Sequence, residues 1–205
     1  AEMRRCVNEL GLRGIEISSH VNGKELAAPE FRPFFAAAEE LGVLLFLHPL
    51  GFTHGQRLSE HYLNNIIGNP IESTIALSHL IFEGVLDSHP GLKLCVAHGG
   101  GYLPGYWGRM DHAWRARPDC RTIIKNPPSS YLEKFYFDSI TFDPEMLKRL
   151  IDKFGADHVV LGTDYPYDMG EEDPLGLIRQ VKRLPKAARD LIQRGNAPRL
   201  LDIKF

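Results

Sequence analysis

The sequence contains little cysteine, and its cysteines are not spaced for cross-linking. Cys6, Cys95 and Cys120 are the three cysteines among 205 residues, and no two of them have the C-x-x-C spacing. An odd number without that spacing argues against both a disulfide framework and a thiolate metal site. The cysteines therefore indicate buried thiols in a reducing compartment, and we predict a cytoplasmic protein.

The sequence also lacks a long hydrophobic run and an excess of charge of either sign. Its 24 Lys and Arg residues and 26 Asp and Glu residues give a formal net charge of −2, with no basic stripe. Nucleic acid and anionic membrane surfaces are therefore not expected as partners. No apolar run approaches the roughly 20 residues of a membrane-spanning helix. Because no linker, repeat or low-complexity tract interrupts the chain, we predict a single domain over residues 1–205.

Five short apolar runs recur along the chain and are separated by helical patterns. The runs are residues 13–18, 43–48, 92–98, 135–140 and 158–164. Most are apolar on both faces, which is typical of parallel strands that are covered by helices. The alternation of strands and helices predicts an α/β fold with a parallel sheet.

The predicted helices have recognisable ends. They cover residues 1–11, 29–42, 69–86, 143–155, 173–184 and 186–194, followed by a terminal helix. Gly42 is expected to end the second helix in the left-handed conformation. Asn69 and Asn196 are expected as N-caps, with Glu72 reaching back to the start of its helix. In 143–155 the predicted apolar stripe is Met146, Leu147, Leu150, Ile151 and Phe154.

Three of the predicted strands end on a potential metal ligand or base. These residues are His48 in LLFLHP, His98 in CVAHGGG and Asp164 in VVLGTDYP. A single histidine at a strand end is more often structural, but three such endings at the carboxyl edge of one parallel sheet favour a site. Imidazole and carboxylate groups suit Zn²⁺ or a similar ion, and a non-ligand histidine suits general acid or base chemistry. The glycines 99–101 either bring the backbone close to a ligand or form a tight turn.

Further polar residues lie near these strand ends. They are His54, Arg57, His61 and Asn65 after His48, then Arg109, Asp111 and His112 after the glycines, and Asp138 within the fourth strand. Of these, His54 and Arg57 are candidate substrate-binding residues. The remaining histidines, His20, His79, His89 and His158, are interpreted as packing or surface residues.

The motifs around these residues resemble those of the amidohydrolase-related family that contains α-amino-β-carboxymuconate-ε-semialdehyde, γ-resorcylate and 5-carboxyvanillate decarboxylases. They are RGIEISSHVNG, FLHP, IGNPIESTIALSHLIFEGVLDSHPGLKLCVAHGGGYLPGYWGRMD, FDSITFD, VVLGTDYPY and GNAPRLL, in the family's order. The resemblance implies a distorted (β/α)₈ TIM barrel with one divalent metal, usually zinc and in some members manganese. It also implies a metal-dependent, non-oxidative decarboxylase that acts on an unsaturated or aromatic small-molecule carboxylic acid.

The resemblance further implies roles for individual residues. His48 and Asp164 are similar to the metal ligands of strands 5 and 8, and His98 is similar to the catalytic histidine of strand 6. Arg109 resembles an arginine that reaches across a dimer interface to a substrate carboxylate, for which a planar guanidinium is well suited. We therefore expect a homodimer or higher homo-oligomer, with Arg109 both catalytic and substrate-binding.

The chain departs from the family at one point. Members begin with a strand that carries a His-x-His or Glu-x-His pair of metal ligands, and neither pair occurs in this sequence. The five predicted strands match strands 4 to 8 of a barrel that takes eight. We therefore expect an N-terminally truncated chain. Two alternatives to the decarboxylase remain open: a hydrolase or hydratase that uses the same site, and a catalytically inactive scaffold.

Overall fold

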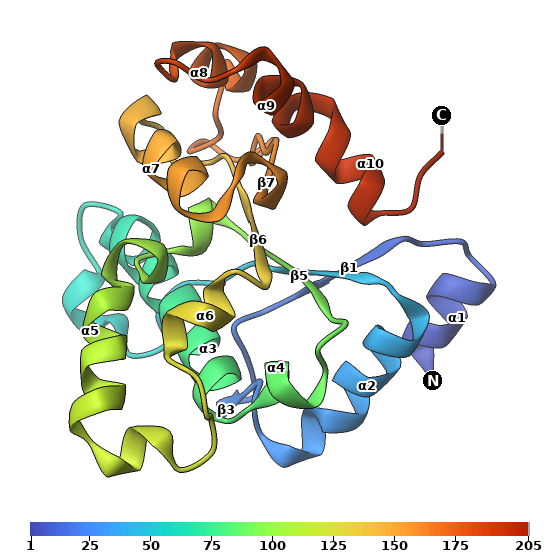
Figure 1. Ribbon diagram of the computed structural model, residues 1–205, viewed down its shortest axis with the longest axis vertical. Coiled ribbons are helices and arrows are strands. Elements are labelled where there is room, and N and C mark those ends of the chain that lie inside the picture. The colour runs from blue at the N-terminus through green and yellow to red at the C-terminus, as the bar shows by residue number, and fades with distance from the viewer. Residues whose placement is uncertain (205) are drawn as a thin grey trace.

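A five-stranded parallel sheet runs through the centre of the protein, whose computed structural model describes residues 1–204 (Figure 1). Its strands are β1 (Gly14–Ile17), β4 (Leu44–Leu47), β5 (Lys93–Val96), β6 (Phe135–Asp138) and β7 (Val159–Val160). They pair in the order β1-β4-β5-β6-β7, so that each successive strand of this sheet lies beside the one before it. This order is typical of a barrel wall, whereas a doubly wound sheet reverses direction partway along.

Helices fill the connections between the strands. They are α1 (Glu2–Asn8), α2 (Arg32–Leu41), α3 (Asn69–Phe82), α4 (Val85–Ser88), α5 (Leu103–Ala116), α6 (Pro128–Leu132), α7 (Pro144–Phe154), α8 (Pro174–Gln180), α9 (Lys186–Asp190) and α10 (Asn196–Leu200). Two π-helical turns, η3 (Asn64–Gly68) and η7 (Leu191–Gly195), lead directly into α3 and α10. In Figure 1, α8 to α10 lie at the top beyond β7, and both termini lie on the right.

The two faces of the sheet have different surroundings. Leu45 and Leu47 of β4 and Phe135 and Phe137 of β6 are fully buried in the core with the helices. The alternate positions of the strands line a cavity of about 350 Å³ on the other face, with Glu16, Leu44, Phe46, Cys95 and Asp138 among its walls. Since neighbouring residues of a strand point to opposite faces, this is the arrangement of a barrel wall with an outer helical layer and an inner lined space.

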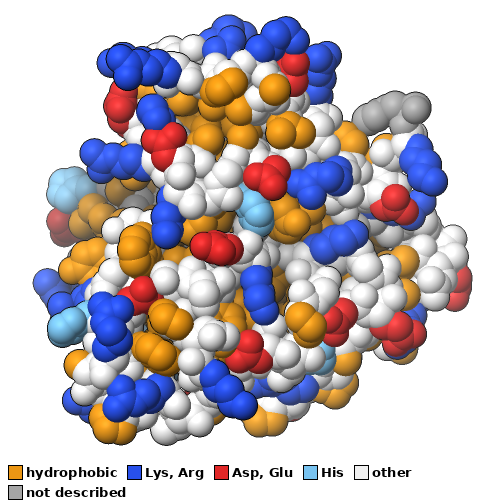
Figure 2. Space-filling view, in the orientation of Figure 1, with side chains coloured by type: hydrophobic (Ala, Val, Ile, Leu, Met, Phe, Trp, Pro, Cys, Tyr) orange, Lys and Arg blue, Asp and Glu red, His pale blue; other side chains and the backbone are white. Residues whose placement is uncertain are grey.

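The helix α3 supplies much of the packing behind the sheet. Its Leu77, Leu80 and Ile81 side chains are fully buried, and burial of each stabilises the fold by roughly 1.5–3 kcal/mol. Figure 2 shows hydrophobic side chains spread over the visible face of the molecule, interspersed with lysine and arginine side chains. No helix within residues 1–204 has both the length and the apolar composition that crossing a membrane would require.

Two of the predicted helix ends are confirmed. Gly42 follows α2 with a φ of 63°, in the left-handed region where glycine has no steric penalty. The Asp143 carboxylate accepts the backbone N–H groups of Glu145 and Met146 at the start of α7. The predicted stripe on α7 is wrong at Met146, whose side chain is 59% exposed.

Both predicted asparagine caps are wrong. The backbone N–H of Asn69 donates to the carbonyl of Asn64, and that of Asn196 donates to the carbonyl of Leu191. Because a π-helical turn precedes each helix, its first N–H groups already have carbonyl partners and need no side-chain cap. Glu72, predicted to reach back along its own helix, bonds to other segments instead.

The remaining differences concern boundaries. The strands are shorter than predicted, α1 ends at Asn8 rather than Gly11, and the predicted helix 69–86 divides at Gly84, whose φ is 66°. The short hairpin of β2 (His20–Val21) and β3 (Lys24–Glu25) was not predicted. Its turn is Asn22–Gly23, a pair that favours tight hairpins because both residues tolerate positive φ.

Candidate metal centre

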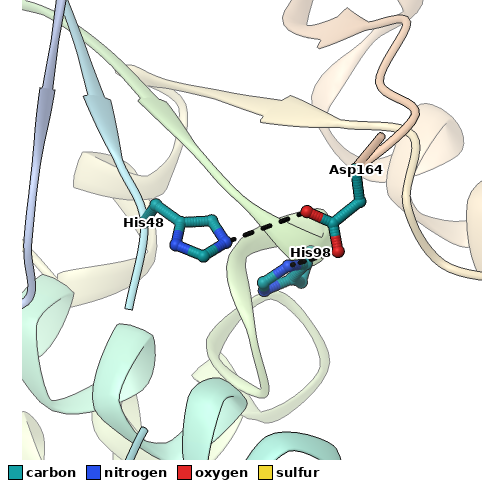
Figure 3. A group of neighbouring side chains, drawn as sticks. All are labelled: His48, His98 and Asp164. Atoms are coloured by element: carbon teal, nitrogen blue, oxygen red, sulfur yellow. Dashed lines mark ion pairs between the residues drawn. The ribbon is translucent and has the colours of Figure 1, made fainter. Parts of the chain in front are cut away.

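Three side chains from different strand ends converge at the carboxyl edge of the sheet. His48 follows β4, His98 follows β5, and Asp164 lies in the loop after β7. One ligand atom from each lies within 4.8 Å of the other two. The Nε2 atom of His48 is 4.0 Å from Oδ1 of Asp164, and Nε2 of His98 is 3.8 Å from Oδ2 (Figure 3). The predicted convergence of these three residues is confirmed.

The electrostatic environment favours metal binding by this cluster. The three side chains are only 17–18% exposed. Burial lowers the pKa of His48, and the neighbouring His98 lowers it further, so the neutral imidazole that can bind a metal is favoured. Two imidazole nitrogens and one carboxylate oxygen form a donor set that suits Zn²⁺ or Mn²⁺. The cluster therefore fits a divalent ion and leaves room for further ligands.

The backbone after β5 explains the three glycines. Four successive residues, 98–101, have φ values of 56°, 60°, 83° and 67°. A Cβ atom on Gly100 would lie 2.7 Å from the Phe137 ring, and one on Gly101 would lie 2.5 Å from the carbonyl of Pro70. The glycines therefore allow a tight turn packed against the protein itself. Gly99 and Gly101 also line a cavity beside the cluster, so the other interpretation left open above, backbone that comes close to a ligand, stays a prediction as well.

Asp138, at the end of β6, fixes this turn from the neighbouring strand. Its carboxylate accepts the backbone N–H groups of His98 at 2.9 Å, Gly99 at 2.8 Å and Ile140 at 3.1 Å. Burial raises the pKa of Asp138, an effect that the three N–H groups and the nearby His98 oppose. The buried carboxylate thus ties together the loops that follow two adjacent strands.

The loop after His48 is held by polar side chains of η3 and α3. The backbone N–H of Gly51 donates to the Asn69 side chain at 2.6 Å, and that of Phe52 donates to Asn64 at 3.0 Å. The Glu72 carboxylate accepts the hydroxyl of Ser19 at 2.8 Å, which connects this loop region to the segment after β1. The residues that resemble helix caps in the sequence therefore shape the wall of the site.

A cavity of about 550 Å³ opens beside the cluster. His98 and Asp164 line it together with side chains of η3, α7 and the loop after β6, including Asn65, Ile66, Thr141, Phe142, Met146 and Arg149. Arg149 and Thr141 were missed by the sequence analysis. Both residues follow β6, the strand that ends at Asp138. This position could have identified them from the sequence, since segments that follow a strand border the carboxyl edge of the sheet.

Three other predicted site residues are not brought to the cluster within this chain. His54, Arg57 and Arg109 are exposed, and none of them lines either cavity. Their roles stay predictions. The histidines interpreted as packing or surface residues have local partners: His89 contacts Glu39 at 3.1 Å, and His158 bonds the carbonyl of Phe135 at 2.8 Å.

Comparison with known proteins gives consistent relatives. A 2-amino-3-carboxymuconate-6-semialdehyde decarboxylase of Dictyostelium discoideum is 41% identical over 204 residues, which cover 98% of this chain and 56% of the relative. A γ-resorcylate decarboxylase of Rhodococcus jostii is 30% identical over 183 residues, which cover 82% of this chain and 56% of the relative. The chain thus spans little more than half the length of these curated relatives.

Solved structures share the fold. The 5-carboxyvanillate decarboxylase of Sphingomonas paucimobilis has a TM-score of 0.89 at 27% identity, covering 99% of this chain and 62% of that one. A dihydroxybenzoic acid decarboxylase of a Polaromonas species, solved with manganese and 2-nitroresorcinol, has a TM-score of 0.87 at 25% identity, covering 98% and 64%. The five strands are therefore part of a (β/α)₈-type barrel. Because the profile of the family described as Amidohydrolase also matches residues 1–203, the chain belongs to the amidohydrolase family.

Proposed function

We propose that the whole protein is a metal-dependent carboxy-lyase that removes CO₂ from an unsaturated or aromatic carboxylic acid without an oxidant. The observation that carries this proposal is the convergence of His48, His98 and Asp164 at one sheet edge. Relatives named as decarboxylases support the reaction type. Three cysteines without a disulfide among the described residues support the cytoplasm as its compartment.

The proposed roles follow from the chemistry of the three side chains. His48 and Asp164 hold the divalent ion; Zn²⁺ is the first candidate, and Mn²⁺ is the second because the Polaromonas relative was solved with manganese. A bound divalent ion would supply positive charge that stabilises negative charge developing on the substrate. When the bond between the substrate carbon and its carboxyl group breaks and CO₂ leaves, the electron pair of that bond stays on the substrate carbon. This carbon then takes up a proton, and His98 assists that proton transfer as a general acid or base.

The larger cavity supports an aromatic or conjugated substrate. Its volume of about 550 Å³ lies within the range of small-molecule pockets, roughly 300–1,000 Å³. Ile66, Phe142 and Met146 give it apolar walls, while His98 and Asp164 add polar groups to its lining. A flat apolar substrate could pack against such walls with its polar groups directed towards the cluster.

The test is CO₂ release by the purified whole protein. The protein, loaded with Zn²⁺ or Mn²⁺, is assayed against a panel of aromatic and muconate-type acids, before and after removal of the metal with a chelator. We expect release from at least one acid, loss on chelation and recovery when metal is restored. A metal-loaded protein that releases no CO₂ from any of these acids would contradict the proposal.

A second candidate function is hydration on the same site. A 2-keto-4-carboxy-3-hexenedioate hydratase of a Sphingobium species is 26% identical over 173 residues of alignment. A metal and a base also serve the addition of water to an unsaturated acid. Following the same acids by mass spectrometry separates the two functions, since a hydratase adds the mass of one water and releases no CO₂.

We also propose that the active form is a homodimer or higher homo-oligomer in which Arg109 serves the neighbouring subunit's site. Arg109 lies on α5, and the nearby Tyr102 and Tyr106 side chains are exposed. Exposed aromatic residues beside an arginine are typical of interface cores. Trp107, a third aromatic residue near Arg109 on α5, packs partly against the protein's own core and therefore gives no support to an interface.

Mixing two inactive variants tests the role of Arg109. If Arg109 acts across the interface, a dimer of Arg109→Ala and His98→Ala chains contains one site with both native residues. We expect part of the activity to return after subunit exchange. Failure to recover activity, with exchange verified by mass spectrometry of differently labelled chains, would exclude action across the interface.

A further inference from the structure

The carboxylate of Asp138 is placed unusually for a group that is not one of the three candidate ligands. Asp138 is only 5% exposed. Three backbone N–H groups, those of His98, Gly99 and Ile140, donate to its two oxygens. An ionised carboxylate is costly to bury unless its hydrogen-bonding capacity is satisfied, and these donors satisfy it with backbone groups alone.

Two of the three donors belong to the turn that carries His98. Oδ2 accepts from His98 at 2.9 Å, and Oδ1 accepts from Gly99 at 2.8 Å. Asp138 lies on β6, whereas His98 follows β5, so the bonds cross from one strand to its neighbour. The carboxylate therefore fixes the backbone of His98 with respect to the sheet rather than with respect to its own loop.

This backbone is in a conformation that His98 would not adopt by preference. Its φ is 56°, in the left-handed region that side chains with a Cβ atom rarely occupy. Such conformations persist only where the surrounding structure holds them, and they are common at functional sites. The direction of the His98 Cα–Cβ bond, and hence of its ring, depends on this φ value. The ring then places Nε2 at 3.8 Å from Oδ2 of Asp164.

We propose that Asp138 is a positioning residue of the active site. By accepting the N–H groups of His98 and Gly99, it holds the strained turn and directs the His98 imidazole at the cluster. Its third bond, from Ile140, fixes the loop that lines the larger cavity. The role of Asp138 in turnover rests on the proposed lyase function, whereas its hold on the turn does not.

Asp138→Asn is the most informative variant because it keeps the size of the side chain. If the amide oxygen takes the Oδ1 position, it retains the bonds from Gly99 and Ile140. The amide NH₂ group then faces the N–H of His98, so that two donors oppose each other where one bond stood. Asp138→Ala removes all three bonds and should have the larger effect.

Asp111→Asn provides a matched control. Asp111 is 6% exposed and likewise accepts a backbone N–H, from Ser129 at 2.9 Å, together with the Ser129 hydroxyl at 2.8 Å. It lies on α5 and lines neither cavity. This control therefore shows how the same chemical change affects hydrogen exchange and kcat when the buried carboxylate does not bond to His98.

The experiment uses the whole metal-loaded protein and two readouts. Hydrogen exchange of the peptide spanning residues 97–101 measures how strongly the backbone of the turn is protected from opening. The values of kcat and KM measure the effect of that protection on turnover. In Asp138→Asn we expect faster exchange in that peptide by about tenfold or more, and a fall in kcat of about 10- to 100-fold with KM and metal content nearly unchanged. Asp111→Asn should leave exchange at 97–101 and kcat at wild-type levels.

The readouts separate the proposal from the proposed function. Wild-type exchange at residues 97–101 as fast as that of an unprotected loop would overturn the positioning role, even if no variant folds. Faster exchange in Asp138→Asn together with an unchanged kcat would also overturn it. If the wild-type protein releases no CO₂, the lyase function fails by itself, and kcat is then measured on whatever reaction the substrate panel reveals. Faster exchange and a lower kcat in Asp138→Asn but not in Asp111→Asn would support the proposal.

Discussion

The division of roles between Asp164 and His98 is open to direct measurement. Asp164 supplies the only carboxylate of the cluster, and its two oxygens lie 4.0 Å and 3.8 Å from the nitrogens of His48 and His98. Asp164→Ala removes one of three potential donors and the negative charge that would balance a dication. His98→Ala removes a donor that, in the proposed mechanism, handles a proton rather than the metal.

The expected magnitudes differ enough to be separated. Removing groups that only support metal ligands typically costs about 10- to 100-fold in affinity or activity. Loss of Asp164 itself should therefore lower metal affinity by at least about 100-fold, equivalent to roughly 2.7 kcal/mol. His98→Ala should change metal affinity by less than about tenfold and lower kcat by about 10²- to 10⁴-fold, as expected for loss of a general acid or base.

Metal affinity is measured by competition with a chromophoric chelator, and metal content is measured by mass spectrometry. His79→Ala is a suitable control, because His79 pairs with Glu25 at 3.9 Å outside the cluster and should change neither quantity. Equal loss of metal from the Asp164 and His98 variants would refute the division of roles. His98 would then be a third ligand, as the short distances within the cluster permit.

Two further predictions concern stability and are read from thermal or urea unfolding of the whole protein. Asn196→Ala should destabilise the fold by about 2–4 kcal/mol, because the fully buried Asn196 amide donates to the carbonyls of Ala156 and Val159 at 2.7 Å each; a cost under 1 kcal/mol would contradict this. His98→Gly should be more stable than His98→Ala by about 1 kcal/mol, since φ at this position is 56°; equal stability would mean that the turn is not strained.

The location of the candidate site was predictable because it depends on topology. Parallel strands place their carboxyl ends at one edge, so the residues after three apolar runs were expected along the same edge. His48, His98 and Asp164 needed no knowledge of exact strand lengths for this, and their convergence holds although β7 has only two residues. The alternation of strands and helices fixed the sheet type for the same reason.

The use of individual polar side chains was much less predictable. Asn69, Glu72 and Asn196 have the sequence context of helix caps, but a side-chain oxygen or amide bonds whichever backbone group tertiary structure brings to it. Asn69 and Glu72 bond the segments after β4 and β1, and Asn196 bonds carbonyls around η6 (Ala156–His158) and β7. The preceding π-helical turns, which remove the need for a cap, have no sequence signal comparable to a proline or a capping box.

The same contrast applies to the residues of the site itself. His98 and Asp164 both have positive φ values, 56° and 57°. Histidine and aspartate are enriched in this region, but most residues of both types lie outside it, so their presence in the sequence does not predict the conformation. The glycines after His98 reveal the turn, but not that His98 shares its left-handed conformation or that Asp138 holds it from the next strand. A strained backbone is maintained by contacts between distant segments. The residues that the proposed mechanism uses could therefore be identified as candidates from the sequence. The hydrogen bonds by which Asp138, itself one of the polar candidates, holds the His98 turn became visible only when the strands were placed side by side.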